Sequence, residues 1–142
     1  MLIQTFLNFT DAQKRHWRGA ELLYDNSRWG NADHLVGLSA ECGLKAVMAR
    51  LGMPLGFSGG PSERGRRKHV QDLWPVFVSF VEERAASVYL RELPPGAPFS
   101  DWSHHDRYSG TGFSRKEAVD QHREAARCIL RMVELTEQDG KL

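Results

Sequence analysis

Three polar side chains recur at helical spacing in an otherwise apolar stretch of the sequence. His34, Glu41 and Lys45 occur within residues 31–52, and their separations of seven and four residues place them in one sector of a helix. Glu41 and Lys45 then form either an ordinary solvated pair or part of a ligand-binding site that a long connection covers. A polar contact between subunits is the third interpretation of this sector.

A second candidate pair lies further along the chain. Arg115 and His122 are seven residues apart, so they project from a helix in almost the same direction. His122 falls within the apolar stripe of that helix, where it is either a packed core histidine with a single hydrogen bond or a functional group. In the functional interpretation, Arg115 binds a phosphate and His122 moves a proton.

Residues 102–108 form the most chemically varied segment outside the predicted helices. Arg107 and Tyr108 offer a guanidinium and a phenol beside the aromatic side chain of Trp102, a combination suited to a phosphate or a stacked base. The alternative is an aromatic loop that only closes the bundle. The same segment contains His104, His105 and Asp106, but adjacent loop residues rarely converge on one ion. Because the sequence has no second cluster of metal ligands, neither a metal nor another cofactor is expected.

A basic run at residues 64–68 ends a stretch that is rich in glycine and proline. Such a run adds a salt-dependent and sequence-independent attraction to a nucleic-acid backbone. It is equally well explained as a solvated loop tip.

The hydrophobic pattern places these candidate residues on or between four helices. We predict helices over residues 10–25, 31–52, 69–89 and 114–137. Capping boxes that begin at Thr10 and Ser114 open the first and the last of them. Two long loops, residues 53–68 and 91–113, connect them. The expected fold is a single all-α domain over residues 1–142, a four-to-five-helix up-and-down bundle.

Composition excludes several classes of protein. The 142 residues carry a net charge of +1, so the molecule as a whole has no strong field for nucleic acid or a membrane. The longest apolar run is too short to cross a membrane and no secretory signal is present, so we expect a cytoplasmic protein whose Cys42 and Cys128 are reduced. Because residues 31–52 are apolar on nearly every side, we also expect a homodimer.

Three segments of the first 50 residues are similar to a known family. They read HWRGAELL at residues 16–23, NADHL at residues 31–35 and AECGLKA at residues 40–46. Together with the length of four helices, they resemble the HEPN superfamily of small helical-bundle proteins, many of them dimeric. In architecture the resemblance covers roughly the whole chain.

The resemblance implies two alternative functions. Many HEPN proteins are metal-independent ribonucleases of toxin, antiphage and RNA-processing systems, in which an arginine and a histidine separated by four to six intervening residues meet at the dimer interface. Three pairs fit that spacing: Arg28 with His34, Arg64 with His69, and Arg115 with His122. In the last pair alone, the arginine is followed by a polar residue and both members lie on one predicted helix face. The leading expectation is therefore a domain for RNA binding or metal-independent RNA cleavage, with Arg115 and His122 as the catalytic residues if it cleaves.

Other HEPN proteins lack this motif and bind nucleotides or partner proteins. The alternative function is therefore a noncatalytic dimeric module for a nucleotide-like ligand or for a protein from a linked system. Its expected ligand-binding residues are those of the helical sector and the loop, namely His34, Glu41, Lys45, Trp102, Arg107 and Tyr108.

Overall fold

The computed structural model describes residues 8–105 and 116–140. These residues form four α-helices and two short 3-10 helices: α1 Phe9–Asp25, α2 Trp29–Arg50, η1 Arg64–Arg66, α3 Val70–Glu83, η2 Ser87–Glu92 and α4 Lys116–Asp139. No strand occurs among the described residues, where one isolated bridge joins Leu55 to Pro61. The predicted all-α bundle is confirmed.

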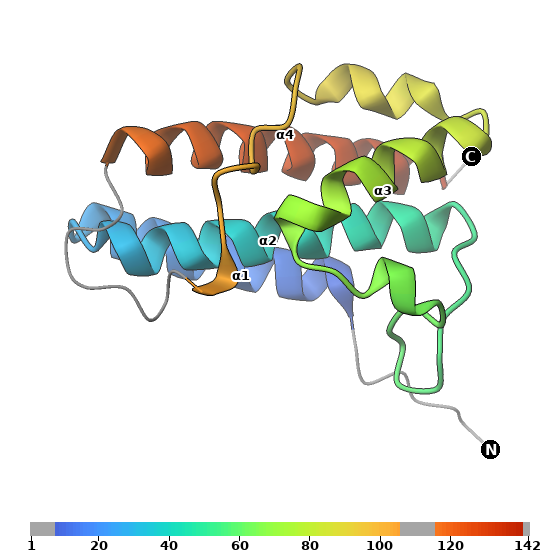
Figure 1. Ribbon diagram of the computed structural model, residues 1–142, viewed down its shortest axis with the longest axis horizontal. Helices are drawn as coiled ribbons and strands as arrows, with labels where there is room; N and C mark the ends of the chain where they lie inside the picture. Colours follow the sequence, from blue (N-terminus) through green and yellow to red (C-terminus); the bar gives the residue numbers. More distant parts are fainter. Residues whose placement is uncertain (1–7, 106–115, 141–142) are drawn as a thin grey trace.

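Helix α2 lies at the centre of the bundle, against α1, α3 and α4 (Figure 1). Its small residues allow this close packing: a Cβ atom at Gly43 would come within 2.4 Å of both Gln13 of α1 and Ile129 of α4. The Ser39 hydroxyl also donates to the Gln13 carbonyl oxygen at 3.0 Å. One chain therefore covers most of α2, so the apolar character of this helix gives no reason to expect a dimer. The homodimer stays a prediction.

The direction of the helices departs in one place from an up-and-down bundle. Helix α1 runs antiparallel to α2, whereas α3 crosses obliquely in the same general direction as α2 (Figure 1). The up-and-down order therefore holds for α1 and α2 but not for α3. Helix α3 has 14 residues and begins near the middle of α2, where His69 contacts Glu41.

Two helix ends differ from those predicted. The side chain of Asn8, not Thr10, caps α1, because its Oδ1 atom accepts the backbone N–H of Asp11 at 3.0 Å. Helix α3 ends at Glu83 rather than near residue 89. Ala85 has a φ of 51°, a left-handed conformation that cannot continue a helix.

Buried apolar side chains of the described residues form one continuous cluster, to which α2, α3, α4 and the segment before α4 all contribute. Cys42 and Cys128 are both unpaired, as expected. No helix within the described residues has the length and apolar character needed to span a membrane.

The segment from residue 93 to residue 105, here named the connection, runs across α4 and α2 (Figure 1). Phe99 and Trp102 in it are buried, so this segment packs onto the bundle. The Trp102 indole N–H donates to the Asp33 carbonyl oxygen at 2.8 Å. Its ring fills the space over Gly37, where a Cβ atom would lie 2.0 Å from a ring carbon.

Replacing Gly37 by alanine tests this packing. We expect Gly37→Ala to lower the free energy of unfolding by about 1–3 kcal/mol, because the rigid Trp102 ring must shift away from the new methyl group. Alanine is intrinsically the better helix former by roughly 1 kcal/mol. Without the contact with Trp102 the substitution should therefore stabilise the protein, so a loss of stability indicates the contact. Urea denaturation measures it. Gly65→Ala is the matched control, since nothing lies within 4 Å of a Cβ atom there, and equal stabilities of the two variants would contradict the packing described.

Candidate functional site

His122 is enclosed where α4, α2 and the connection meet. Its side chain is 2% exposed. Its Nδ1 atom lies 2.6 Å from Asp33 Oδ1 and its Nε2 atom lies 2.7 Å from Asp101 Oδ1, while the Phe99 ring stacks on the imidazole with centroids 5.3 Å apart. We name Asp33, His122 and Asp101 the carboxylate–histidine triad. It joins two helices to the connection that precedes α4.

Both ring nitrogens of His122 are used inside the protein. Burial by itself lowers the pKa of His122, but the hydrogen bonds and charges of Asp33 and then of Asp101 outweigh it, so the pKa is raised above its usual value. A histidine in this environment holds a proton firmly. This arrangement differs from both interpretations of the sequence: His122 is a buried histidine with two charged partners rather than one, and it does not face solvent as a proton-transfer group for RNA would.

The polar sector of α2 is covered rather than solvated. The Lys45 Nζ atom lies 3.0 Å from Glu41 Oε2, and the two side chains are only 11% and 14% exposed. The other carboxylate oxygen of Glu41 lies 2.9 Å from His69 Nδ1, and the His34 ring stacks on Trp102 with centroids 6.0 Å apart. The sector therefore faces the start of α3 and the connection, and the solvated interpretation of the Glu41–Lys45 pair is wrong.

Three histidine rings follow one another beside this sector. The ring centroids of His69 and His104 are 4.1 Å apart, and those of His104 and His105 are 3.9 Å apart. The His69 side chain is 42% exposed and His105 is exposed. We name these three residues the histidine row. It brings His69, which follows the basic run, next to His104 and His105 at the end of the connection.

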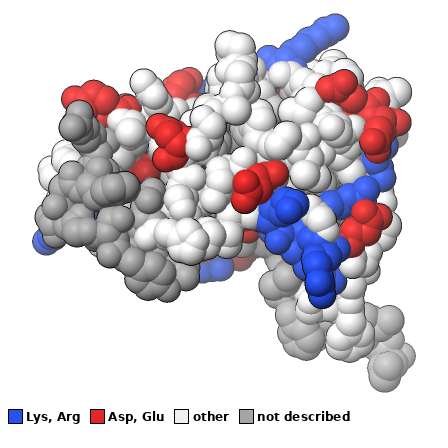
Figure 2. Space-filling view, in the orientation of Figure 1, with Lys and Arg blue, Asp and Glu red and all other residues white. Residues whose placement is uncertain are grey.

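The basic run lies next to the histidine row at the surface. Figure 2 shows lysine and arginine side chains gathered over η1 and the start of α3. Arg67 donates to the carbonyl oxygens of Pro61 and Ser62 at 2.7 and 3.1 Å, which holds the loop in place. Arg64 and Lys68 are exposed, so their charges face solvent.

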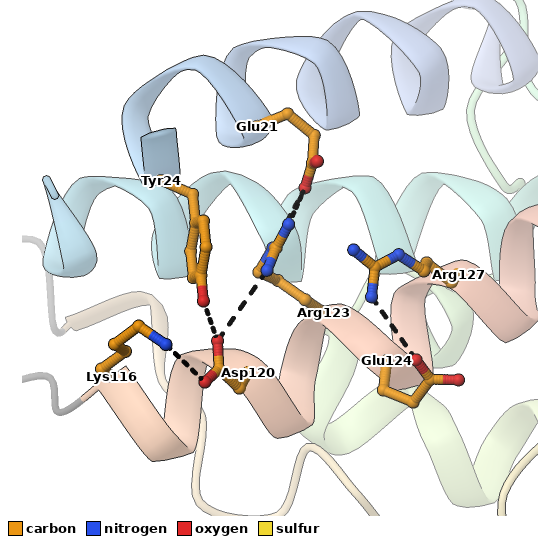
Figure 3. A network of polar contacts seen from close by, with 7 residues as sticks. All are labelled: Glu21, Tyr24, Lys116, Asp120, Arg123, Glu124 and Arg127. Carbon is orange, nitrogen blue, oxygen red and sulfur yellow. Dashed lines mark hydrogen bonds and ion pairs between the residues drawn. The ribbon is translucent and has the colours of Figure 1, made fainter. Parts of the chain in front are cut away.

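A second polar network joins α1 to α4 (Figure 3). Arg123 donates to Glu21 Oε1 at 2.6 and 3.0 Å and lies over the Tyr24 ring at 3.5 Å. The Tyr24 hydroxyl donates to Asp120, and Lys116 contacts the same carboxylate at 3.1 Å. Cations and carboxylates alternate in this network and neutralise one another. We therefore assign it to helix packing rather than to a ligand.

The structure brings together only some of the residues predicted to form a site. His34 meets Trp102 and Glu41 meets Lys45, but among the described residues no hydrogen bond or ion pair joins His122 to the α2 sector. Arg107, Tyr108 and Arg115 lie outside the described residues.

Sequence reasoning missed Asp33, Asp101 and His69 as partners. Each aspartate directly precedes one of the predicted ligand-binding residues, Asp33 before His34 and Asp101 before Trp102, which is the one sequence signal for them. What the sequence did not show was that both carboxylates face the same histidine.

Three hollows of the described surface lie away from these groups. One, with a volume of about 370 Å³, is lined by Arg66, Pro75, Val76, Ser79, Phe80 and Glu83. The other two, of about 310 and 340 Å³, both include Arg50. None of the three includes His34, Glu41, Lys45, Trp102 or His122. Within residues 8–105 and 116–140, no group of three or more histidine, cysteine or acidic side chains is arranged to hold a metal ion.

Comparisons of the chain with protein-family models, with curated proteins and with solved structures give no match.

Removing the Lys45 ammonium tests whether the α2 sector is covered. We expect Lys45→Ala to lower the free energy of unfolding by about 1–3 kcal/mol, because Glu41 then keeps a largely buried negative charge with one fewer donor. Denaturation with urea measures the loss. Lys116→Ala is the control, since it removes another lysine from an i,i+4 pair, but an exposed one, and its effect should be markedly smaller. Equal losses would show that the Glu41–Lys45 pair behaves as a surface pair.

Proposed function

We propose that this chain is a cytoplasmic module that binds single-stranded RNA through the basic run and the histidine row. The observation that carries the proposal is the continuity of the two features. The exposed cations of residues 64–68 lead directly into His69, whose ring begins a row of three neighbouring imidazoles that are tilted against one another by 32° and 39°.

The local charge supports binding of a polyanion, although the net charge of the chain is only +1. Three carboxylates near this surface already have cationic or histidine partners. Glu41 contacts Lys45 and His69, and Glu63 contacts Arg66 at 3.4 Å. Asp101 is bound by His122. Within the described residues Arg64 and Lys68 make no ion pair, so their exposed charges can attract phosphates.

The imidazole rings favour a single strand over a duplex. Unpaired bases stack on planar side chains, and histidine is one of the residues that RNA-binding proteins use in this way. His105 is exposed at one end of the row. A duplex would offer the rings no free base, so only its phosphates would contribute to binding.

Binding is favoured over cleavage by the position of His122. Both of its nitrogens contact carboxylates and its ring is buried. Neither nitrogen is therefore accessible to an RNA substrate for the proton transfer that the sequence predicted. The alternative of a small phosphorylated ligand in the α2 sector is disfavoured because Lys45 is buried against Glu41. The noncatalytic members of the HEPN superfamily are thus the better analogy.

Fluorescence anisotropy with a labelled single-stranded RNA in the presence of EDTA tests the proposal. We expect binding at low salt that weakens steeply as salt is added. Reversing both exposed charges, in the double variant Arg64→Glu and Lys68→Glu, should reduce affinity by about tenfold or more and make the salt dependence shallower. The control reverses two exposed charges of α1, Lys14→Glu and Arg18→Glu, and should retain most of the affinity.

Three results would contradict the proposal. The first is no binding at low salt. The second is an equal loss of affinity in both double variants, which would indicate only a general effect of charge. The third is RNA cleavage in EDTA that disappears in a folded His122→Gln variant, because this would make His122 catalytic.

A further inference from the structure

The carboxylate–histidine triad is the polar attachment of the connection to α4. Asp33 belongs to α2 and is buried, whereas Asp101 belongs to the connection and its side chain is 61% exposed. His122 bridges them at 2.6 and 2.7 Å. One edge of the imidazole therefore faces a carboxylate fixed in the bundle, and the other faces a carboxylate that can move into water.

The number of protons in the triad decides whether this bridge holds. An imidazolium ion has two N–H groups and donates to both carboxylates, whereas a neutral imidazole has only one. When the proton leaves, the lone pair of one ring nitrogen faces a carboxylate oxygen at hydrogen-bond distance, and the contact becomes repulsive. Asp101 is the partner that can separate, because it gains hydration when it moves away. Asp33 stays where α2 places it.

Side chains next to the triad also hold the connection on the bundle. Phe99 stacks on the His122 ring. Trp102 donates its indole N–H to the Asp33 carbonyl oxygen and seats its ring over Gly37. Phe99 and Asp101 of the connection are thus held by His122 of α4. Trp102 is held by the beginning of α2.

We infer that His122 is a pH-dependent latch, which holds the connection on α2 and α4 while the imidazole is protonated and loosens it when the proton is lost. The groups that face His122 are Asp33 from α2 and Asp101 and Phe99 from the connection. Within the described residues, no charged side chain of α1, α3 or α4 makes an ion pair with it. The latch does not rest on the proposed binding of RNA.

The direction of the pH effect follows from the raised pKa of His122. A histidine whose pKa is higher in the folded than in the unfolded protein stabilises the folded state fully below the unfolded value of about 6.5. That contribution is lost as the pH rises through the raised folded value. The latch is therefore closed at low pH and loosens as the pH rises through the raised pKa of His122.

Hydrogen exchange of the Trp102 indole N–H, followed by NMR, tests the latch. Comparing about pH 6 with about pH 9, on either side of the usual histidine pKa, we expect the protection of Trp102 to fall several-fold relative to that of Trp74. Trp74 is a suitable internal standard because it is also buried but belongs to α3. The Trp102 signal is assigned from its absence in Trp102→Phe.

The Asp101→Asn variant separates a latch from general loosening. Its amide N–H can donate to the lone pair of a neutral His122, so no proton is required and the protection of Trp102 should no longer depend on pH. Asp72→Asn, which neutralises an exposed carboxylate of α3, should behave as the unmodified protein does. Circular dichroism at both pH values identifies any variant that has unfolded.

Two outcomes would overturn the inference. One is a constant ratio of Trp102 to Trp74 protection in the unmodified protein at both pH values. The other is an unchanged pH dependence in a folded Asp101→Asn variant, which would assign the effect to another group.

Discussion

The arrangement of the connection depends on the pair of hydrogen bonds that the protonated His122 ring makes to Asp33 and Asp101. A buried charged imidazole is stable only because Asp33 and Asp101 both accept from it. Removing one partner would leave a buried charge with too few acceptors, so the three groups act as a unit. Through that unit, the beginning of α2, the beginning of α4 and the segment with Phe99 and Trp102 are fixed relative to one another.

Close packing around α2 is the second constraint, and it explains why the polar groups are covered. Glycine at positions 37 and 43 lets Trp102, Gln13 and Ile129 approach the helix backbone. With its neighbours this close, α2 has no wide solvated face, and Glu41 pairs with both Lys45 and His69. The histidine row follows from this pairing, because the contact with Glu41 places the His69 ring beside that of His104, with centroids 4.1 Å apart.

The sequence predicted the helices well and the contacts between them poorly. Apolar periodicity and breaking residues defined the cores of the four helices to within a few residues, except at the end of α3, where a left-handed Ala85 has no sequence signal. The spacing of His34, Glu41 and Lys45 correctly placed them in one sector, but periodicity does not say what packs against it. The partners of His122 lie 89 and 21 residues away in the chain, and only the tertiary fold brings them together.

Because both ring nitrogens of His122 lie at hydrogen-bond distance from a carboxylate oxygen, we expect the ring to carry two protons at neutral pH. Nitrogen-15 NMR of the imidazole measures this directly, because protonated and unprotonated ring nitrogens have widely separated chemical shifts. Both Nδ1 and Nε2 of His122 should have the shift of a protonated nitrogen at neutral pH. A shift typical of a nitrogen lone pair at either position would contradict it, since the triad would then hold its proton on a carboxyl group or hold none.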